Sequence, residues 1–161
     1  MVTESASFRI PEMFSNIPEE LRRRRQWVVW KLEERDGELT KVPYTPGSKR
    51  RASSTDLETW RSFGEALSAL ESRRFDGIGF MFSSGDPYTG IDLDGCRNPE
   101  TGAIRREAQE IIESLDAYTE VSPSGKGVHI IVRGKLERNR KRGWIEAYSC
   151  ERFFTMTGIA L

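Results

Sequence analysis

Short runs of β-branched and aromatic residues, separated by glycine, proline and charged residues, dominate the pattern of the chain. Such runs are typical of strands, and they predict strands at residues 26–34, 39–46, 76–82, 91–95, 118–122, 127–134, 144–149 and 151–158. Asp36 and Gly37 stand between the first two runs and predict a tight hairpin turn. Pro43 lies in the second run and predicts an edge strand, because proline has no N–H to donate to a neighbour.

Helices are predicted in three further segments, residues 16–26, 54–74 and 105–117. In the first segment, Asn16 is expected to cap the helix and Pro18 to occupy its first position. In the second, Ser54 or Thr55 is expected to be the cap, with Glu58 completing a capping box. Its predicted buried face consists of five apolar side chains at helical spacing: Leu57, Trp60, Phe63, Leu67 and Leu70.

Strands and helices are mixed along the chain, and hairpin-like returns follow residue 115. This order favours an α+β domain with a largely antiparallel sheet over a doubly wound parallel fold. Residues 1–15 are polar and aperiodic and are expected to form a flexible tail. Residues 16–161 are enough to enclose one hydrophobic core. The chain stops just after its last predicted strand, where either a whole protein or an N-terminal domain can end.

Composition narrows the class of protein and its compartment. No run approaches the ~20 apolar residues of a membrane span, and the first residues lack the pattern of a signal peptide. We therefore expect a cytoplasmic protein with no membrane partner. Cys96 and Cys150 form no CxxC pair, so a zinc site is not expected and both should remain free thiols.

Charge is balanced overall but unevenly distributed. Twenty-five basic and 25 acidic residues give a net charge of zero, which excludes a uniformly basic nucleic-acid binder. Basic residues nevertheless cluster at residues 22–25, 49–51 and 138–142. Each cluster is either a solvated surface or a patch that follows a phosphate backbone.

Two aspartates stand one residue apart in the apolar stretch "TGIDLDGC". On a strand, Asp92 and Asp94 point to the same face, roughly 6.5–7 Å apart along the chain. Buried carboxylates need compensation by cations or hydrogen bonds, and carboxylate oxygens suit Mg²⁺ or Mn²⁺. A metal pair and an ordinary pair of capping or ion-paired aspartates both fit this motif taken alone.

Glu146, in "GWIEAYS", is the best candidate for a third carboxylate, because it also lies in an apolar strand. If its strand neighbours the strand of Asp92, the carboxylates can hold two divalent ions, as two-metal phosphoryl transfer requires. The alternative is a glutamate on the solvent face of a strand.

His129 is the single histidine of the chain and follows the turn "SPSGKG". Gly125 and Gly127 allow a tight turn whose amide groups could face an anion, while Ser124 adds a hydroxyl and Lys126 a positive charge. This turn is a candidate phosphate cradle, although it is not a Walker loop, because "GKG" lacks the required spacing and no helix follows.

Three further cations could reach a phosphate. Arg152 follows Glu146 by six residues, and its planar guanidinium is suited to binding phosphate. Lys41 and Lys49 could also extend to phosphates. A surface position explains Arg152 equally well, and it explains Lys41 and Lys49 better.

Together these motifs resemble the archaeo-eukaryotic primase superfamily, especially the primase–polymerase (prim-pol) domains of plasmid and phage replication proteins. The resemblance rests on "GIDLDGC", on "SPSGKGVHIIV", on "WIEAY" followed by "CERFFTMTG", and on the upstream "QWVVWKLEE". It covers roughly residues 16–161. Many relatives carry serine where this chain has Gly127, so Ser122 or Ser124 would have to supply that hydroxyl.

The resemblance implies a fold, a reaction and partners. The fold is an RRM-like catalytic subdomain beside a smaller N-terminal α/β unit. The reaction is template-directed transfer of nucleotides from nucleoside triphosphates on a DNA template, single-stranded or primed. A helicase or other replication domain is expected further along the parent protein.

The resemblance also implies roles for individual residues. Asp92, Asp94 and Glu146 would bind Mg²⁺ or Mn²⁺. Ser124, Lys126, His129 and Arg152 would bind the nucleotide, with His129 also counted in the catalytic set. Two other functions remain open: a non-catalytic module that binds single-stranded nucleic acid, and a two-metal nuclease. Three converging carboxylates argue against the first, and a triphosphate cradle argues against the second.

Overall fold

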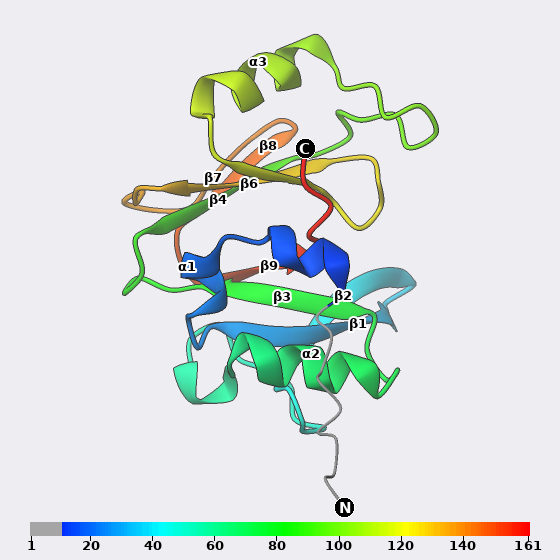
Figure 1. Cartoon of the computed structure of the whole chain (residues 1–161), viewed down its shortest axis with the longest axis vertical. Coiled ribbons are helices and arrows are strands. Elements are labelled where there is room, and N and C mark those ends of the chain that lie inside the picture. Colours follow the sequence, from blue (N-terminus) through cyan, green and yellow to red (C-terminus); the bar gives the residue numbers. More distant parts are fainter. Residues whose placement is uncertain (1–10) are drawn as a thin grey trace, which may run out of the picture.

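Two antiparallel sheets form the body of the protein, in a computed structural model that describes residues 11–161 (Figure 1). The first sheet has the order β2–β1–β3–β9, with β1 Trp27–Arg35, β2 Glu38–Tyr44, β3 Gly77–Phe82 and β9 Arg152–Met156. The second has the order β5–β6–β4–β8–β7, with β4 Tyr88–Leu93, β5 Tyr118–Val121, β6 Val128–Arg133, β7 Arg140–Arg142 and β8 Ile145–Tyr148. Every strand pair in both sheets is antiparallel, which confirms the predicted α+β class.

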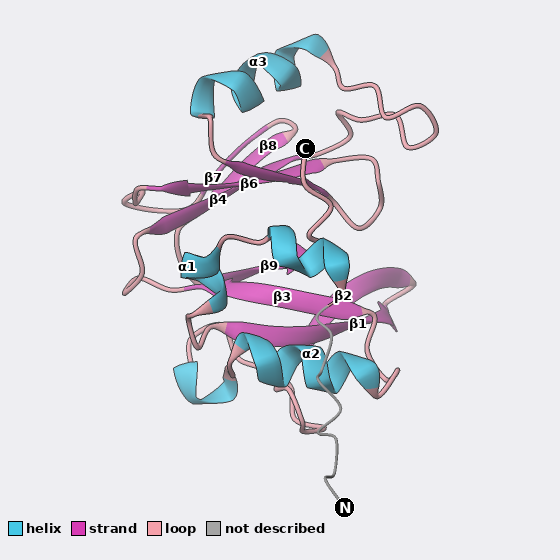
Figure 2. Cartoon of the chain, in the orientation of Figure 1, coloured by secondary structure: helices cyan, strands magenta, loops and turns pink. Residues whose placement is uncertain are grey.

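The helices lie over the sheets (Figure 2). The helical segments are η1 Glu12–Asn16, α1 Glu19–Arg22, η2 Leu57–Thr59, α2 Phe63–Glu71 and α3 Arg106–Leu115. Apolar residues of η1, α1 and α2 join Trp27 and Phe80 of the first sheet in the main core. α3 lies on the side of the second sheet that faces away from the first, where Ala108 packs with Leu93 and Ile130.

The two sheets meet where β9, an edge strand of the first sheet, lies against the second. Phe82 of β3 and Phe154 of β9, whose rings are 5.1 Å apart, face the second sheet from the first. A Cβ atom at Gly90 of β4 would lie only 2.5 Å from Phe154 and 2.6 Å from Phe82. Glycine at this position therefore allows the sheets to approach each other closely.

All eight predicted strands are present, although β4 ends at Leu93 and leaves Asp94 outside the strand, and several finer features are present as well. Asp36 and Gly37 connect β1 and β2, and both have positive φ angles. β2, which contains Pro43, is an edge strand as predicted. Cys96 and Cys150 are free thiols. Within residues 11–161, no helix is both long and apolar enough to cross a membrane.

The predicted helix at residues 54–74 is wrong over its first half. α2 begins only at Phe63, with Ser62 as its cap and Glu65 completing the capping box, so Ser54, Thr55 and Glu58 do not form one. Leu57 is 67% exposed rather than part of the buried face. Trp60 is buried in a different cluster, with Val28 and Met81. The three- and four-residue spacing therefore included residues that do not share one helical face, because Leu57 faces solvent and Trp60 packs in another cluster.

Other boundaries also differ from the prediction. The helix expected at residues 16–26 is the single turn α1, with Pro18 as its cap instead of Asn16. The basic cluster at residues 138–142, which lies outside every predicted strand, contains the short strand β7. Of the expected tail at residues 1–15, residues 1–10 lie outside the described part, whereas η1 includes the buried Phe14.

The two sheets do not correspond to an N-terminal unit followed along the chain by a catalytic subdomain. The second sheet and α3 form the strand-rich part expected after residue 75. However, β3 and β9 complete the first sheet, so the end of the chain returns to the N-terminal part.

Candidate active site

Five ionisable side chains form one row across the second sheet. Asp92 of β4 is directly opposite His129 of β6 on one side and Glu146 of β8 on the other. Glu120 of β5 is opposite His129, and Lys141 of β7 is opposite Glu146. Because directly opposed residues share a face of the sheet, all five lie on the same face. The Glu146 strand is therefore a neighbour of the Asp92 strand, which was the condition for a shared carboxylate site.

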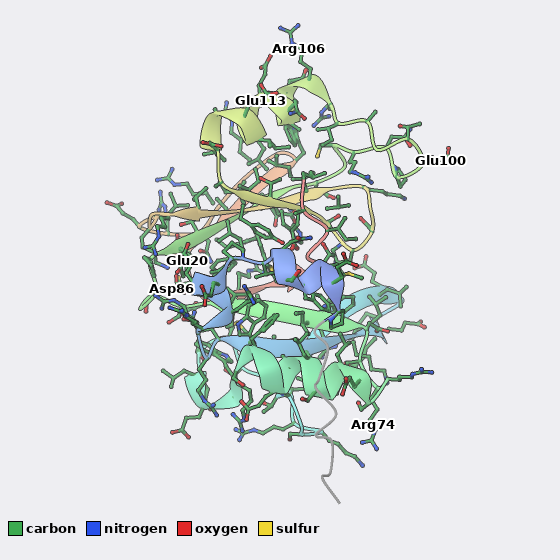
Figure 3. The ribbon with its side chains drawn as sticks, viewed as in Figure 1. Glu20, Arg74, Asp86, Glu100, Arg106 and Glu113 are labelled. Carbon is green, nitrogen blue, oxygen red and sulfur yellow. The ribbon has the colours of Figure 1, made fainter. Side chains whose placement is uncertain are left out.

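This face of the second sheet is turned toward the first sheet. The His129 ring stacks on Phe154 of β9, with centroids 4.6 Å apart and an interplanar angle of 25°. Residues of alternate positions, such as Leu93 and Ile130, belong to the opposite face beneath α3. The face beneath α3 is thus apolar, whereas the face toward the first sheet carries the ionisable row beside residues of the main core, such as Tyr88 and Ile131. Figure 3 shows the side chains of both layers.

Asp92 occupies the middle of the row, and its side chain is 30% exposed. Burial raises the pKa of Asp92, and the charges of Asp94 and Glu146 raise it further, whereas His129 and Lys41 act in the opposite direction. Asp94 lies just beyond β4, where its N–H donates to the carbonyl of Trp144 at 2.9 Å. The neighbouring carboxylates thus repel the charge of Asp92, and His129 and Lys41 offset part of that repulsion.

Glu146 is paired with a cation. Nζ of Lys141 is 2.6 Å from Oε1 of Glu146, and this hydrogen bond raises the pKa of Lys141. The lysine is largely exposed, while the Glu146 side chain is 21% exposed. An exposed ammonium on a flexible stem can move away from the carboxylate at little cost, so Glu146 remains accessible to another cation.

Arg152 lies beside this pair. Its guanidinium is 4.9 Å from the centre of the Tyr148 ring. A surface hollow of about 450 Å³ is lined by Asn139, Arg140, Lys141, Glu146, Tyr148 and Arg152. Arg152 is thus on the Glu146 side of the row.

His129 has a defined orientation. Its Nδ1 is 3.0 Å from the carbonyl oxygen of Thr155 on β9. A carbonyl only accepts hydrogen bonds, so this geometry assigns the hydrogen to Nδ1. Nε2 then points the other way and lies 3.6 Å from Oδ1 of Asp92. The histidine therefore presents Nε2 to the carboxylates.

Glu120 was not identified from the sequence. Its side chain is completely buried, and Oε1 lies 3.8 Å from Nδ1 of His129. The available signal was a glutamate between Thr119 and Val121 in an otherwise uncharged strand. That pattern is compatible with a solvent-facing residue, and only the position of the chain end beside β5 reveals its burial.

The turn before His129 differs in detail from the predicted phosphate cradle. Ser124 and Lys126 are exposed. The amides expected to face an anion are already bonded: Gly125 N–H to the Ser122 carbonyl at 2.9 Å, Lys126 N–H to the Ser124 hydroxyl at 3.2 Å, and Gly127 N–H to the Ser122 hydroxyl at 3.1 Å. The expectation that Gly125 and Gly127 expose amides to an anion is therefore wrong, while the exposed side chains of Ser124 and Lys126 remain available to a ligand.

Gly127 packs against the end of β4. A Cβ atom here would lie 2.9 Å from the carbonyl oxygen of Leu93 and 3.2 Å from the hydroxyl of Ser122. The Ser122 hydroxyl thus lies next to the position where a serine side chain at 127 would begin. Ser122 is itself buried, so its hydroxyl stabilises the turn.

The first sheet also contributes a cation. Burial lowers the pKa of Lys41 on β2, while the charges of Asp92 and Asp94 act to raise it. Lys41 therefore lies within electrostatic reach of both aspartates. Lys49 instead lines a separate hollow along α2, together with Ser68.

No group of three histidine, cysteine, aspartate or glutamate side chains is already gathered around a single point within residues 11–161. The donor set nevertheless suits a hard divalent cation. The pKa of Asp92 is raised chiefly by burial, so a bound cation would stabilise its ionised form, and Glu146 already holds a positive group in Lys141. Asp92 and Asp94 could bind a cation at once, and Glu146 could join them after Lys141 has moved.

The chain is similar to a curated phage protein. Over 145 residues it is 37% identical to the DNA primase-polymerase of Nitratiruptor phage NrS-1, and the alignment covers 86% of this chain. The chain spans about a fifth of the length of that relative, 20%. No family model matches the chain.

Proposed function

We propose that residues 16–161 form the catalytic domain of a DNA primase-polymerase, related to the prim-pol group of the archaeo-eukaryotic primase superfamily. The observation that carries this proposal is the row of Asp92, His129 and Glu146 on adjacent strands. The similarity to a DNA primase-polymerase over most of the chain supports it.

The reaction would be nucleotidyl transfer. The 3′-hydroxyl of a primer, or of a first nucleotide, attacks the α-phosphorus of a nucleoside triphosphate. A new P–O bond forms, the bond to the β-phosphate oxygen breaks, and pyrophosphate leaves. Positioning and charge stabilisation can account for most of such catalysis, so no nucleophilic side chain is needed.

The carboxylates would provide the metal site. Asp92 and Asp94 would hold Mg²⁺ or Mn²⁺, with Glu146 completing the set when Lys141 releases it. The bound ions would supply the positive charge that activates the hydroxyl and stabilises the leaving pyrophosphate. Lys141, once free of Glu146, could turn to the phosphates.

The remaining polar residues would bind substrates. Nε2 of His129 faces the carboxylates and would donate to a phosphate oxygen when protonated. Ser124 and Lys126 lie in the turn that leads into the His129 strand, and Arg152 lies beside Glu146. All three side chains could approach a triphosphate. The exposed residues 138–142 would follow the template backbone, a contact that should weaken with salt. A helicase or other replication domain in the parent protein agrees with the greater length of the relative.

The direct test is incubation with labelled deoxynucleotides or ribonucleotides, Mg²⁺ or Mn²⁺, and a primed DNA template. We expect primer extension that is lost in Asp92→Ala while the circular dichroism spectrum is unchanged. Extension by Asp92→Ala at the wild-type rate would contradict the proposal.

The same assay separates the other two functions. Shortening of the template would identify a two-metal nuclease. Tight binding of single-stranded DNA, with neither extension nor shortening, would identify a binding module. The carboxylates of Asp92 and Glu146 on adjacent strands favour a catalytic function over that module.

A further inference from the structure

Glu120 is a charged residue in a place that normally excludes charge. Its side chain is 0% exposed. Three protein donors reach it: Thr157 N–H bonds Oε1 at 2.9 Å, Gly158 N–H bonds Oε2 at 2.9 Å, and the Tyr118 hydroxyl bonds Oε2 at 2.8 Å. A carboxylate with this many donors can be stable without solvent.

The Glu120 carboxylate affects the ionisation of the Tyr118 hydroxyl. Burial raises the pKa of Tyr118 well above its usual value, and the charge of Glu120 together with their hydrogen bond raises it further. Tyr118 therefore stays a neutral donor to Glu120.

The surroundings of Glu120 converge on one side of His129. Oε1 is 3.8 Å from Nδ1, and the carbonyl of Thr155 is 3.0 Å from the same atom. Thr155 is two residues before Thr157, whose amide Glu120 holds. Glu120 therefore acts on the imidazole directly, through its charge, and indirectly, by fixing the strand end that carries the Thr155 carbonyl.

The other side of His129 faces the site. Phe154 covers the ring, and Nε2 lies 3.6 Å from Asp92. A neutral imidazole has one hydrogen, which resides on either nitrogen. The Thr155 carbonyl and the Glu120 carboxylate favour the hydrogen on Nδ1. Nε2 of the neutral ring then carries the lone pair, and it donates to a phosphate only when it also binds a proton.

We propose that Glu120 is a positioning residue that fixes the tautomer and ring orientation of His129, so that Nε2 is directed to the phosphates of the nucleotide. The inferred contact with a nucleotide rests on the proposed function, whereas the inferred ring orientation does not. A carboxylate or carbonyl behind the second nitrogen of a working histidine is a general means of setting its orientation.

The single histidine of the chain makes a spectroscopic test unambiguous. In protein labelled with ¹⁵N-histidine, long-range ¹H–¹⁵N correlation spectra report which ring nitrogen carries the hydrogen. At a pH where the ring is neutral, we expect only the Nδ1–H form in the wild type. In Glu120→Gln, which keeps the shape and removes the charge, we expect both tautomers to be populated. An Nε2–H form in the wild type would overturn the proposal, even if the variant did not fold.

Binding of dATP in the presence of Mn²⁺ supplies the second measurement. We expect Glu120→Gln to weaken binding about tenfold, which corresponds to about 1.4 kcal/mol. Tyr118→Phe is the matched control, because it removes one hydrogen bond to Glu120 and retains the charge beside His129. We expect Tyr118→Phe to change binding by less than about twofold.

A double variant separates positioning from a purely structural role. If Glu120 acts through His129, Glu120→Gln should have no further effect on dATP binding in a His129→Ala background. Additive losses, or an unchanged tautomer in folded Glu120→Gln, would show that Glu120 only stabilises the fold. If wild-type protein fails to bind dATP, the proposed function fails, while the tautomer spectra still decide the role of Glu120.

Discussion

Glu120 and Glu146 belong to the same row on the second sheet, yet their environments are opposite. Each is on a strand next to one that carries a central residue of the row: Glu120 beside His129, and Glu146 beside Asp92. Glu120 is fully buried and bonded by two backbone amides and a tyrosine. Glu146 is partly exposed, and its partner is the exposed Lys141.

The difference indicates how each charge is used. Backbone amides cannot leave, so the charge of Glu120 is permanently satisfied and can act only on the neighbouring His129. A lysine side chain can leave, so the charge of Glu146 can be transferred to a different cation. One end of the row therefore sets geometry, and the other end can bind a ligand.

Replacement of Asp92, between the two ends, should have the largest effect. We expect Asp92→Asn to lower the rate of primer extension on the order of 10³-fold, as expected for loss of a central charge in the site. The pKa of Asp92 is raised in the folded protein, so its ionised form is disfavoured there. That cost appears as pH rises through the ordinary aspartate range and is complete above the raised pKa.

Asp92→Asn should therefore melt at a higher temperature than the wild type at pH 7 in the presence of a chelator. Melting curves followed by circular dichroism would measure this. A lower melting temperature would mean that Asp92 stabilises the fold, as Glu120 is expected to do.

Glu146→Gln should affect activity and leave stability nearly unchanged. We expect primer extension to fall about 100-fold if Glu146 is a metal ligand. Because its partner is an exposed lysine, the free energy of unfolding should change by less than about 0.5 kcal/mol. Parallel extension assays and urea titrations would measure both quantities, and a large loss of stability with full activity would reverse the comparison.

Glu120→Gln should show the opposite balance. An amide nitrogen in place of one carboxylate oxygen would face a donor instead of accepting from it, which costs about 2 kcal/mol of folding free energy. A urea titration beside that of Glu146→Gln gives the direct contrast. Equal stabilities of the two variants would show that burial does not distinguish the two glutamates.

Lys141→Met should have the smallest effect. Removing the ammonium leaves Glu146 without its partner, so a divalent cation no longer competes with lysine. We expect Mn²⁺ to bind about twofold to fivefold more tightly in the absence of nucleotide, in keeping with the small energies of exposed ion pairs. Calorimetric titration with Mn²⁺ would measure this, and weaker binding would assign Lys141 a different role.

The sequence predicted the features of this site that depend on local pattern. Alternation along the strands placed Asp92, Glu146 and His129 within strands, and Pro43 correctly indicated an edge. The capping box was misplaced because Ser62 and Glu65 repeat the spacing of Thr55 and Glu58, and only burial distinguishes the two.

Features that depend on distant parts of the chain were not predictable. The amides that satisfy Glu120 follow it by 37 and 38 residues. β7 has three exposed basic residues without alternation and forms only as a partner of β8. The internal bonds of the turn before His129 depend on Ser122, whose hydroxyl competes with any anion for the Gly127 amide.

The return of β9 to the first sheet has a consequence for the order in which the molecule is made. During synthesis, the carboxylate row can assemble once β8 has emerged, but Phe154, Thr155 and the amides that hold Glu120 come later. Pairings between such distant segments form slowly. In a nascent chain, the carboxylates of the row should therefore come together before β9 orients His129. Competence for the proposed reaction would then be among the last properties that the chain gains.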